Sequence, residues 1–184
     1  MASSKKLSII RRAAICLALV VTLLLGLYIS LLASSRGLNI EQKHQVRVAV
    51  ALIREKGFTD EAILLEHVAV YRADDNWLNS SVAKENAYAA TNFPFEIMTL
   101  YPDFFTYPAD DVERAAILLH EARHLEGKDE KDAYGFVWRN RKVLGWTADR
   151  YAASPVWSNV RRQTSEDVPE LFICQGKPFG DCTE

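Results

Sequence analysis

The sequence predicts an α+β domain that follows a single membrane-spanning helix. Residues 13–33 form an apolar run that no charged residue interrupts. Residues 110–127 carry apolar side chains in a helical pattern between a capping residue and a glycine. Residues 96–100 lie in an aromatic-rich segment and are the best candidate for a β-strand. These three observations define the predicted fold class.

The apolar run is the first element of the chain. At a helical rise of about 1.5 Å per residue it spans roughly 30 Å, the thickness of a bilayer hydrocarbon core. Basic residues concentrate in residues 1–12 and only Arg36 follows closely, so the positive-inside rule predicts a cytoplasmic tail and an exported domain at residues 37–184. A cleaved signal peptide also ends in small residues, as at 33–35. We favour an uncleaved anchor because the apolar core of a signal peptide is usually only about 7–15 residues.

The composition excludes one class of partner. The chain has 184 residues, which is enough for one globular domain and an accessory segment. Its formal net charge is -2 and its pI is about 6.1, and no basic stripe with interleaved aromatic residues is present. We therefore expect no nucleic-acid partner.

Two cysteines near the C-terminus agree with export. Cys174 and Cys182 flank a turn-rich segment that a disulfide could close in an oxidising compartment. The alternative is a pair of free thiols in a mobile tail.

The segments between the anchor and the main helix differ in how clearly they can be interpreted. Residues 39–56 have apolar positions with a helical trend and end at Gly57. Residues 62–72 are apolar and partly β-branched, so they fit either a strand or the end of a helix. Residues 76–91 are mixed and give no clear prediction.

The main helix has clear signals at both ends. Asp110 is its predicted N-cap, with Glu113 reaching back to complete a capping box, and Gly127 provides a left-handed stop. A second helix is predicted over residues 129–145. Beyond it we expect one further short helix and a loose tail.

The main helix carries the motif His120-Glu121-Ala122-Arg123-His124. Residues four apart lie on one face of a helix, so His120 and His124 can present two imidazoles to one zinc ion, leaving room for a third ligand and water. Glu121 can then take a proton from a water molecule that the metal polarises. The alternative is a pair of surface histidines, but residues 117–119 predict a buried segment, in which imidazoles need partners.

The spacing beyond this motif resembles that of the metzincins. It reads His120-Glu-x-x-His124-x-x-Gly127-x-x-Glu130. In metzincins a glycine turn reverses the chain and a third ligand, usually His or Asp, returns to the metal. This chain has Glu130 at that position, and both of its methionines precede the motif, so the methionine turn of that clan is absent.

Residues 96–138 resemble the catalytic core of the deuterolysin group, the aspzincins, which include lysine-specific metalloendopeptidases. The resemblance rests on residues 98–102, on the apolar run and motif that follow, and on Asp132-Ala133-Tyr134-Gly135. It implies a zincin-like fold in which a small sheet packs on the motif helix. It also implies that the zinc ligands and general base fall on His120, His124 and Glu121. The Gly-Thr dipeptide of that group is absent here and the loop is shorter, which leaves the acidic ligand open.

Four acidic residues compete to be the third ligand. Glu126 lies two residues past His124, on the wrong side of the helix. Asp129 is a natural N-cap for the next helix, which would occupy its oxygens. Glu130 follows the glycine reversal directly and is our choice, with Asp132 as the runner-up. For all four, a solvated acidic loop is the alternative.

The remaining polar candidates have simpler interpretations. Tyr134 could donate a hydrogen bond to a developing oxyanion, or could pack as a half-buried aromatic residue under the loop. Arg123 is expected to be an exposed ion-pair partner of Glu126 or Asp129. His44 and His67 have no companions at ligand spacing and are expected to be structural.

Together these features predict a membrane-anchored zinc metalloendopeptidase that acts on peptides or proteins on the exported side. Two alternatives stay open. One is a metal-binding module that keeps the ligands but cleaves nothing. The other is a membrane-tethered interaction or assembly protein in which the motif is only a buried polar helix. The oligomeric state is not indicated by the sequence.

Overall fold

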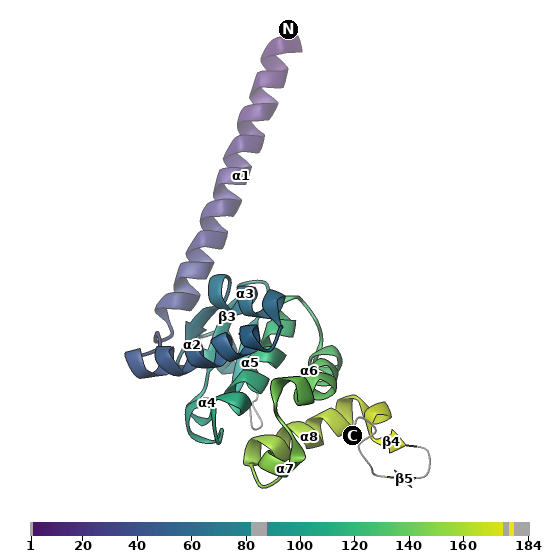
Figure 1. The fold of residues 1–184 in the computed structure, drawn as a ribbon. Coiled ribbons are helices and arrows are strands. Elements are labelled where there is room, and N and C mark those ends of the chain that lie inside the picture. Colours follow the sequence, from purple (N-terminus) through teal and green to yellow (C-terminus); the bar gives the residue numbers. More distant parts are fainter. Residues whose placement is uncertain (1, 82–87, 175–176, 179–184) are drawn as a thin grey trace. The chain divides into compact units, whose positions relative to one another are not determined.

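The computed structural model describes residues 2–81, 88–174 and 177–178 (Figure 1). The chain is a mostly helical α+β structure with a small three-stranded mixed sheet and a long apolar helix at its N-terminus. It divides into two compact units. The first holds the described residues up to Arg36 together with the segment from Asp75 to Ser81, and the second holds the rest.

The first unit is dominated by α1 (Ala2–Ala33). Its apolar stretch from Ile9 to Ala33 is long and hydrophobic enough to cross a membrane, and its side chains are mostly exposed. The helix therefore suits either a signal anchor or a signal sequence. Trp77 packs in the same unit, donating its indole N–H to the Ser30 hydroxyl at 3.2 Å and lying just before η1 (Asn79–Ser81).

The second unit opens with two helices. Helix α2 (Ile40–Glu55) begins at a capping box in which Asn39 and Gln42 exchange side-chain-to-backbone hydrogen bonds. Helix α3 (Thr59–His67) follows, and β1 (Val70–Arg72) comes directly after it. Both interpretations of residues 62–72 are thus correct, each for one half of the segment.

The sheet has the strand order β1-β3-β2. Strand β3 (Ile97–Leu100) is central and all four of its residues are buried, which confirms the predicted strand. It runs parallel to β1 and antiparallel to β2 (Ala89–Asn92). Strand β2 ends the sheet among the described residues and packs against α5, the helix that carries the histidine motif.

Two helices form the centre of the second unit. Helix α5 (Asp111–Leu125) contacts α2 and α3 as well as α6 (Glu130–Leu144). Gly127 has a φ of +74° in the turn between α5 and α6, a conformation that an L side chain adopts only at a cost. The chain reverses there as the sequence predicts.

The C-terminal part has more structure than the expected short helix and loose tail. Three tryptophan rings and one phenylalanine ring pack around α6 and α8, with centroids 5.0 to 6.0 Å apart, and form the core of this part. The predicted pairing of Cys174 with Cys182 lies outside the described residues.

The remaining elements are short or lie near the C-terminus. Helix α4 (Pro102–Thr106) follows β3. After α6 come α7 (Ala148–Tyr151), α8 (Pro155–Asp167), η2 (Pro169–Leu171), β4 (Ile173–Cys174) and β5 (Lys177–Pro178).

Candidate metal centre

Helix α5 is fixed at its N-terminal end by two acidic side chains. Asp110 accepts hydrogen bonds from the N–H groups of Val112 and Glu113, as the predicted N-cap should. The reciprocal bond differs from the predicted capping box, because Glu113 accepts from the N–H of Ala109 rather than from Asp110. The helix start is therefore correct, and the carboxylate of Glu113 faces inward instead of closing the box.

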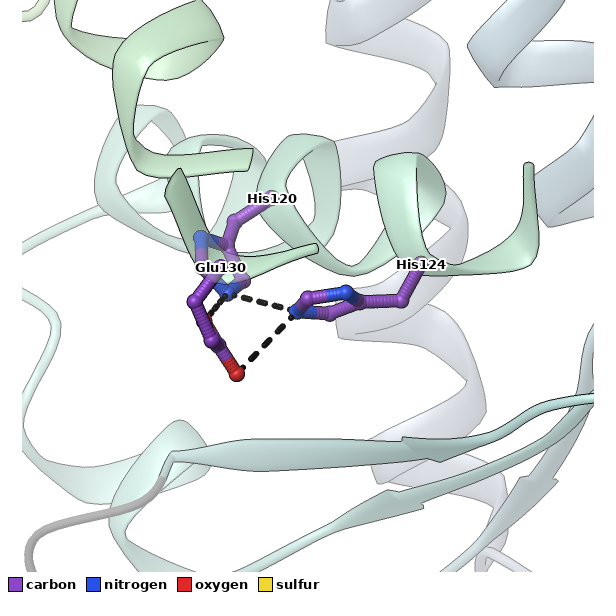
Figure 2. A group of neighbouring side chains, drawn as sticks. All are labelled: His120, His124 and Glu130. Atoms are coloured by element: carbon purple, nitrogen blue, oxygen red, sulfur yellow. Dashed lines mark hydrogen bonds and ion pairs between the residues drawn. The ribbon is translucent and has the colours of Figure 1, made fainter. Parts of the chain in front are cut away.

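The two motif histidines face each other across one helical turn. Their rings are 4.8 Å apart between centroids, and the two Nε2 atoms are 3.1 Å apart (Figure 2). Both side chains are largely covered, with 13% of His120 and 17% of His124 exposed. The alternative, a pair of surface histidines, therefore does not describe this fold.

A backbone carbonyl sets the orientation of one ring. His124 Nδ1 lies 2.9 Å from the carbonyl oxygen of Lys128. Because a carbonyl oxygen can only accept, Nδ1 carries a hydrogen, and Nε2 is the ring nitrogen left to face His120 and Glu130. Metal-binding histidines are commonly oriented in this way, by donating their second ring nitrogen to a carbonyl.

Glu130, the first residue of α6, completes the cluster. Its two carboxylate oxygens lie 3.2 Å from His120 Nε2 and 3.4 Å from His124 Nε2 (Figure 2). The two imidazoles hold the pKa of the Glu130 carboxyl well below its usual range. Burial alone would lower the pKa of His124, but the hydrogen bond to Glu130 and the charge of Glu121 outweigh it and raise that pKa to about 9. The cluster thus attracts positive charge.

The donor set fits a small divalent cation. Three ligand atoms, two imidazole nitrogens and one carboxylate oxygen, lie within 4.8 Å of one another. For a tetrahedral ion with ligands at about 2.0–2.1 Å, neighbouring ligand atoms are about 3.3 Å apart. The two Nε2 atoms are 3.1 Å apart, which is close to that value. Glu130 approaches His120 Nε2 at 3.2 Å through one carboxylate oxygen and His124 Nε2 at 3.4 Å through the other. Nitrogen and carboxylate donors of this kind suit zinc.

The other acidic candidates lie elsewhere. Asp129 caps α6 by accepting the N–H of Asp132 at 2.9 Å. Asp132 in turn accepts two hydrogen bonds from Arg123, and Glu126 accepts one from the same guanidinium. Among the four acids the fold therefore brings only Glu130 to the histidines. Arg123 does pair with neighbouring carboxylates, but its side chain is 13% exposed and not, as expected, on the open surface.

Glu121 lies beside the cluster with a partner that the sequence did not reveal. Its carboxylate is 5% exposed and accepts a hydrogen bond of 2.7 Å from the hydroxyl of Thr91 on β2. It is close enough to raise the pKa of both His124 and Tyr134 through its charge. Thirty residues separate Thr91 from Glu121, and no local spacing relates them, so only the packing of β2 on α5 identifies this pair.

Tyr134 packs against the first histidine. Its ring centroid lies 4.3 Å from that of His120, with 52° between the ring planes. Burial and then the negative charges of Glu130 and Glu121 raise the pKa of its phenol far above the usual value. The phenol therefore keeps its proton and is a donor at neutral pH.

Comparison with known proteins adds no relative. No model of a known protein family, no curated protein and no solved structure matches this chain. The similarity to the deuterolysin group thus stays a prediction from the residues that carry it.

Neither His44 nor His67 belongs to the cluster; both have exposed side chains.

Proposed function

We propose that this chain is a zinc-dependent metallopeptidase with a zincin-like catalytic core, held at the membrane by α1. The convergence of His120, His124 and Glu130 is the observation that carries the proposal. Two of these ligands come from one helical turn and the third from the first turn of the next helix. A second carboxylate, Glu121, stands on the same helix beside them, which is what hydrolysis requires in addition to a metal.

Zinc held by these three residues would polarise the scissile carbonyl and make water acidic enough to ionise near neutral pH. Glu121 would take a proton from the attacking water and deliver it to the leaving amine. The oxygen of water bonds to the carbonyl carbon as the carbon–nitrogen bond breaks, so the products are a carboxylic acid and an amine. The Thr91 hydroxyl, which donates to Glu121, would hold that carboxylate in one orientation.

Tyr134 is the candidate donor to the developing oxyanion. Its phenol stays protonated and its ring lies against that of His120. A positioned donor of this type is effective because negative charge on the carbonyl oxygen appears only in the transition state.

The edge of the sheet supports a peptide as the substrate. Tyr101 donates its N–H to the carbonyl of Tyr88 at 3.0 Å, so these opposed residues form a hydrogen-bonded pair. Alternation along antiparallel strands then turns the backbone groups of Ala89 and Thr91 away from β3. Within the described residues no strand lies beyond β2. An extended peptide could add to this edge next to Glu121.

The placement at the membrane rests on α1. The helix has the length and composition of a span, and the basic residues concentrated in its N-terminal part, up to residue 12, favour a cytoplasmic N-terminus. The second unit would then act on the periplasmic or extracellular side. A cleaved signal sequence would leave the same catalytic unit free on that side.

The full chain in nanodiscs, loaded with Zn²⁺ and incubated with a mixture of peptides, provides the test. Mass spectrometry should find cleaved peptides with the wild type, and none with Glu121→Gln although this variant keeps its zinc. If both forms bind zinc and neither cleaves any peptide, the metal-binding module replaces the enzyme. If the wild type binds no zinc, the tethered interaction protein is the better account.

A further inference from the structure

Arg123 lies inside the histidine motif but its guanidinium faces away from the metal ligands. It donates two hydrogen bonds to one oxygen of Asp132, at 3.1 and 3.0 Å, and one to Glu126 at 2.7 Å. The same group lies 4.4 Å from the centroid of the Phe136 ring. A third carboxylate, Glu61 on α3, is 3.7 Å away. One side chain therefore joins α3, α5 and α6.

The backbone of Arg123 also contacts the loop between α5 and α6. Its carbonyl accepts the N–H of Lys128 at 3.0 Å. The carbonyl of Lys128 is the group that orients the His124 ring. The loop between α5 and α6 thus bears on two ligands at once, because it carries the acceptor for His124 and ends at Glu130.

The charge of Arg123 also separates the acidic residues by role. Glu126 and Asp132 lie four and two residues from Glu130, and each also has a carboxylate that could bind a metal ion. Both carboxylates form ion pairs with the Arg123 guanidinium, which balances their charge and holds them away from the histidines. Glu130 is the acid left to face the two imidazoles.

We propose that Arg123 is a positioning residue of the metal centre, which ties the first turn of α6 to the motif helix and so places Glu130 and the His124 ring for the cation. The inference rests on the proposed function, since it concerns the same metal. It adds a role for a position of the motif that supplies no ligand and no base. Lysine does not reproduce a partly buried planar guanidinium that donates to two carboxylates at once and lies over an aromatic ring.

The test is a zinc titration of the full chain in nanodiscs against a chromophoric chelator. Arg123→Met should weaken zinc binding by about 10–100-fold, the usual effect of losing a residue that orients metal ligands. Arg123→Lys should lose less zinc affinity than Arg123→Met, because lysine keeps the positive charge although it lacks the planar guanidinium. Arg114→Met is the matched control: Arg114 lies on the same helix, is also 13% exposed and pairs with Asp111 at 2.9 Å. This control should bind zinc as the wild type does.

Thermal unfolding of the metal-free proteins separates positioning from general stability. Both methionine variants should lose comparable stability, whereas only Arg123→Met loses zinc affinity. Equal zinc affinity in wild type and Arg123→Met overturns the inference and leaves the proposed metal site intact. Equal losses of affinity in both methionine variants also overturn it, because they indicate a general effect. If the wild type binds no zinc, the proposed function itself fails.

A double-mutant cycle tests the contact that carries the role. Asp132→Asn should weaken zinc binding less than Arg123→Met does, because its amide oxygen still accepts and Arg123 keeps its contacts with Glu126 and Phe136. The double variant should be no weaker than Arg123→Met alone. Additive losses would contradict action through this pair. A complete loss of zinc in Asp132→Asn alone would make Asp132 a ligand and overturn the inference.

Discussion

Removal of the buried Glu113 carboxylate should destabilise the fold strongly. Its side chain is fully buried at the N-terminal end of α5. One oxygen accepts from the Ala109 N–H at 2.8 Å and from the Ser154 hydroxyl at 2.7 Å, and the other accepts from the Trp146 indole at 3.2 Å. The motif helix is therefore tied through one carboxylate to the segment before α7 and to the residue that caps α8.

Glu113→Ala leaves these donors without their acceptor. Each unsatisfied buried donor costs about 1–3 kcal/mol, and the Ser154 and Trp146 groups are both buried, so the total with the cavity is about 3–6 kcal/mol. For a domain of this size 1 kcal/mol corresponds to about 2–4 °C in Tm, which predicts a fall of about 6–24 °C. Glu113→Gln should lose less, about 1–3 kcal/mol, because its amide oxygen can still serve the side with two donors.

Thermal unfolding of the metal-free full chain in detergent, followed by tryptophan fluorescence, measures both changes. Glu166→Ala is the control, because Glu166 is 60% exposed and pairs with Arg162 one turn away. Its Tm should stay close to that of the wild type. If Glu113→Ala unfolds at the same temperature as this control, the buried hydrogen bonds do not hold the helix as described.

Four other substitutions have expected outcomes, one of them as a control. Gly127→Ala should lose about 1–2 kcal/mol, because φ is +74° there. Gly145→Ala, at φ +84°, should lose as much stability. Only Gly127→Ala should weaken zinc binding in a chelator titration, and equal zinc affinities of the two variants would refute this. Asn39→Ala should cost about 0.5–2 kcal/mol through the lost capping box, measured by thermal unfolding, and an unchanged Tm would speak against that cap. Thr91→Val should lower stability by about 1–3 kcal/mol by removing the donor to buried Glu121, while the zinc affinity stays that of the wild type; a lost affinity would place Thr91 closer to the metal.

The parts of the fold that follow from local chemistry were predictable. Asp110 and Gly127 fix the two ends of the motif helix through capping and a positive φ, and both act within a few residues of sequence. The spacing from His124 to Glu130 likewise follows from one helix end, one reversal and one helix start. Local sequence rules are therefore sufficient to place all three residues of the cluster near one another.

The parts that depend on long-range packing were not predictable. Strand β2 is short and lacks an apolar alternation, so its residues gave no signal before β3 paired with it. Thr91 reaches Glu121 only because that strand packs on α5. Arg123 was expected to be exposed and paired only with a carboxylate on its own helix or the following turn. The acidic residues of α3 and α6 that also contact it are brought there by packing.

Metal analysis of the purified full chain tests the central claim most directly. Wild type and Glu121→Gln should each contain about one zinc ion per chain, since one three-residue cluster was found among the described residues. His120→Ala and Glu130→Ala should contain little or none. Equal zinc in all four proteins, or none in the wild type, would contradict a metal centre built on these two histidines and this glutamate.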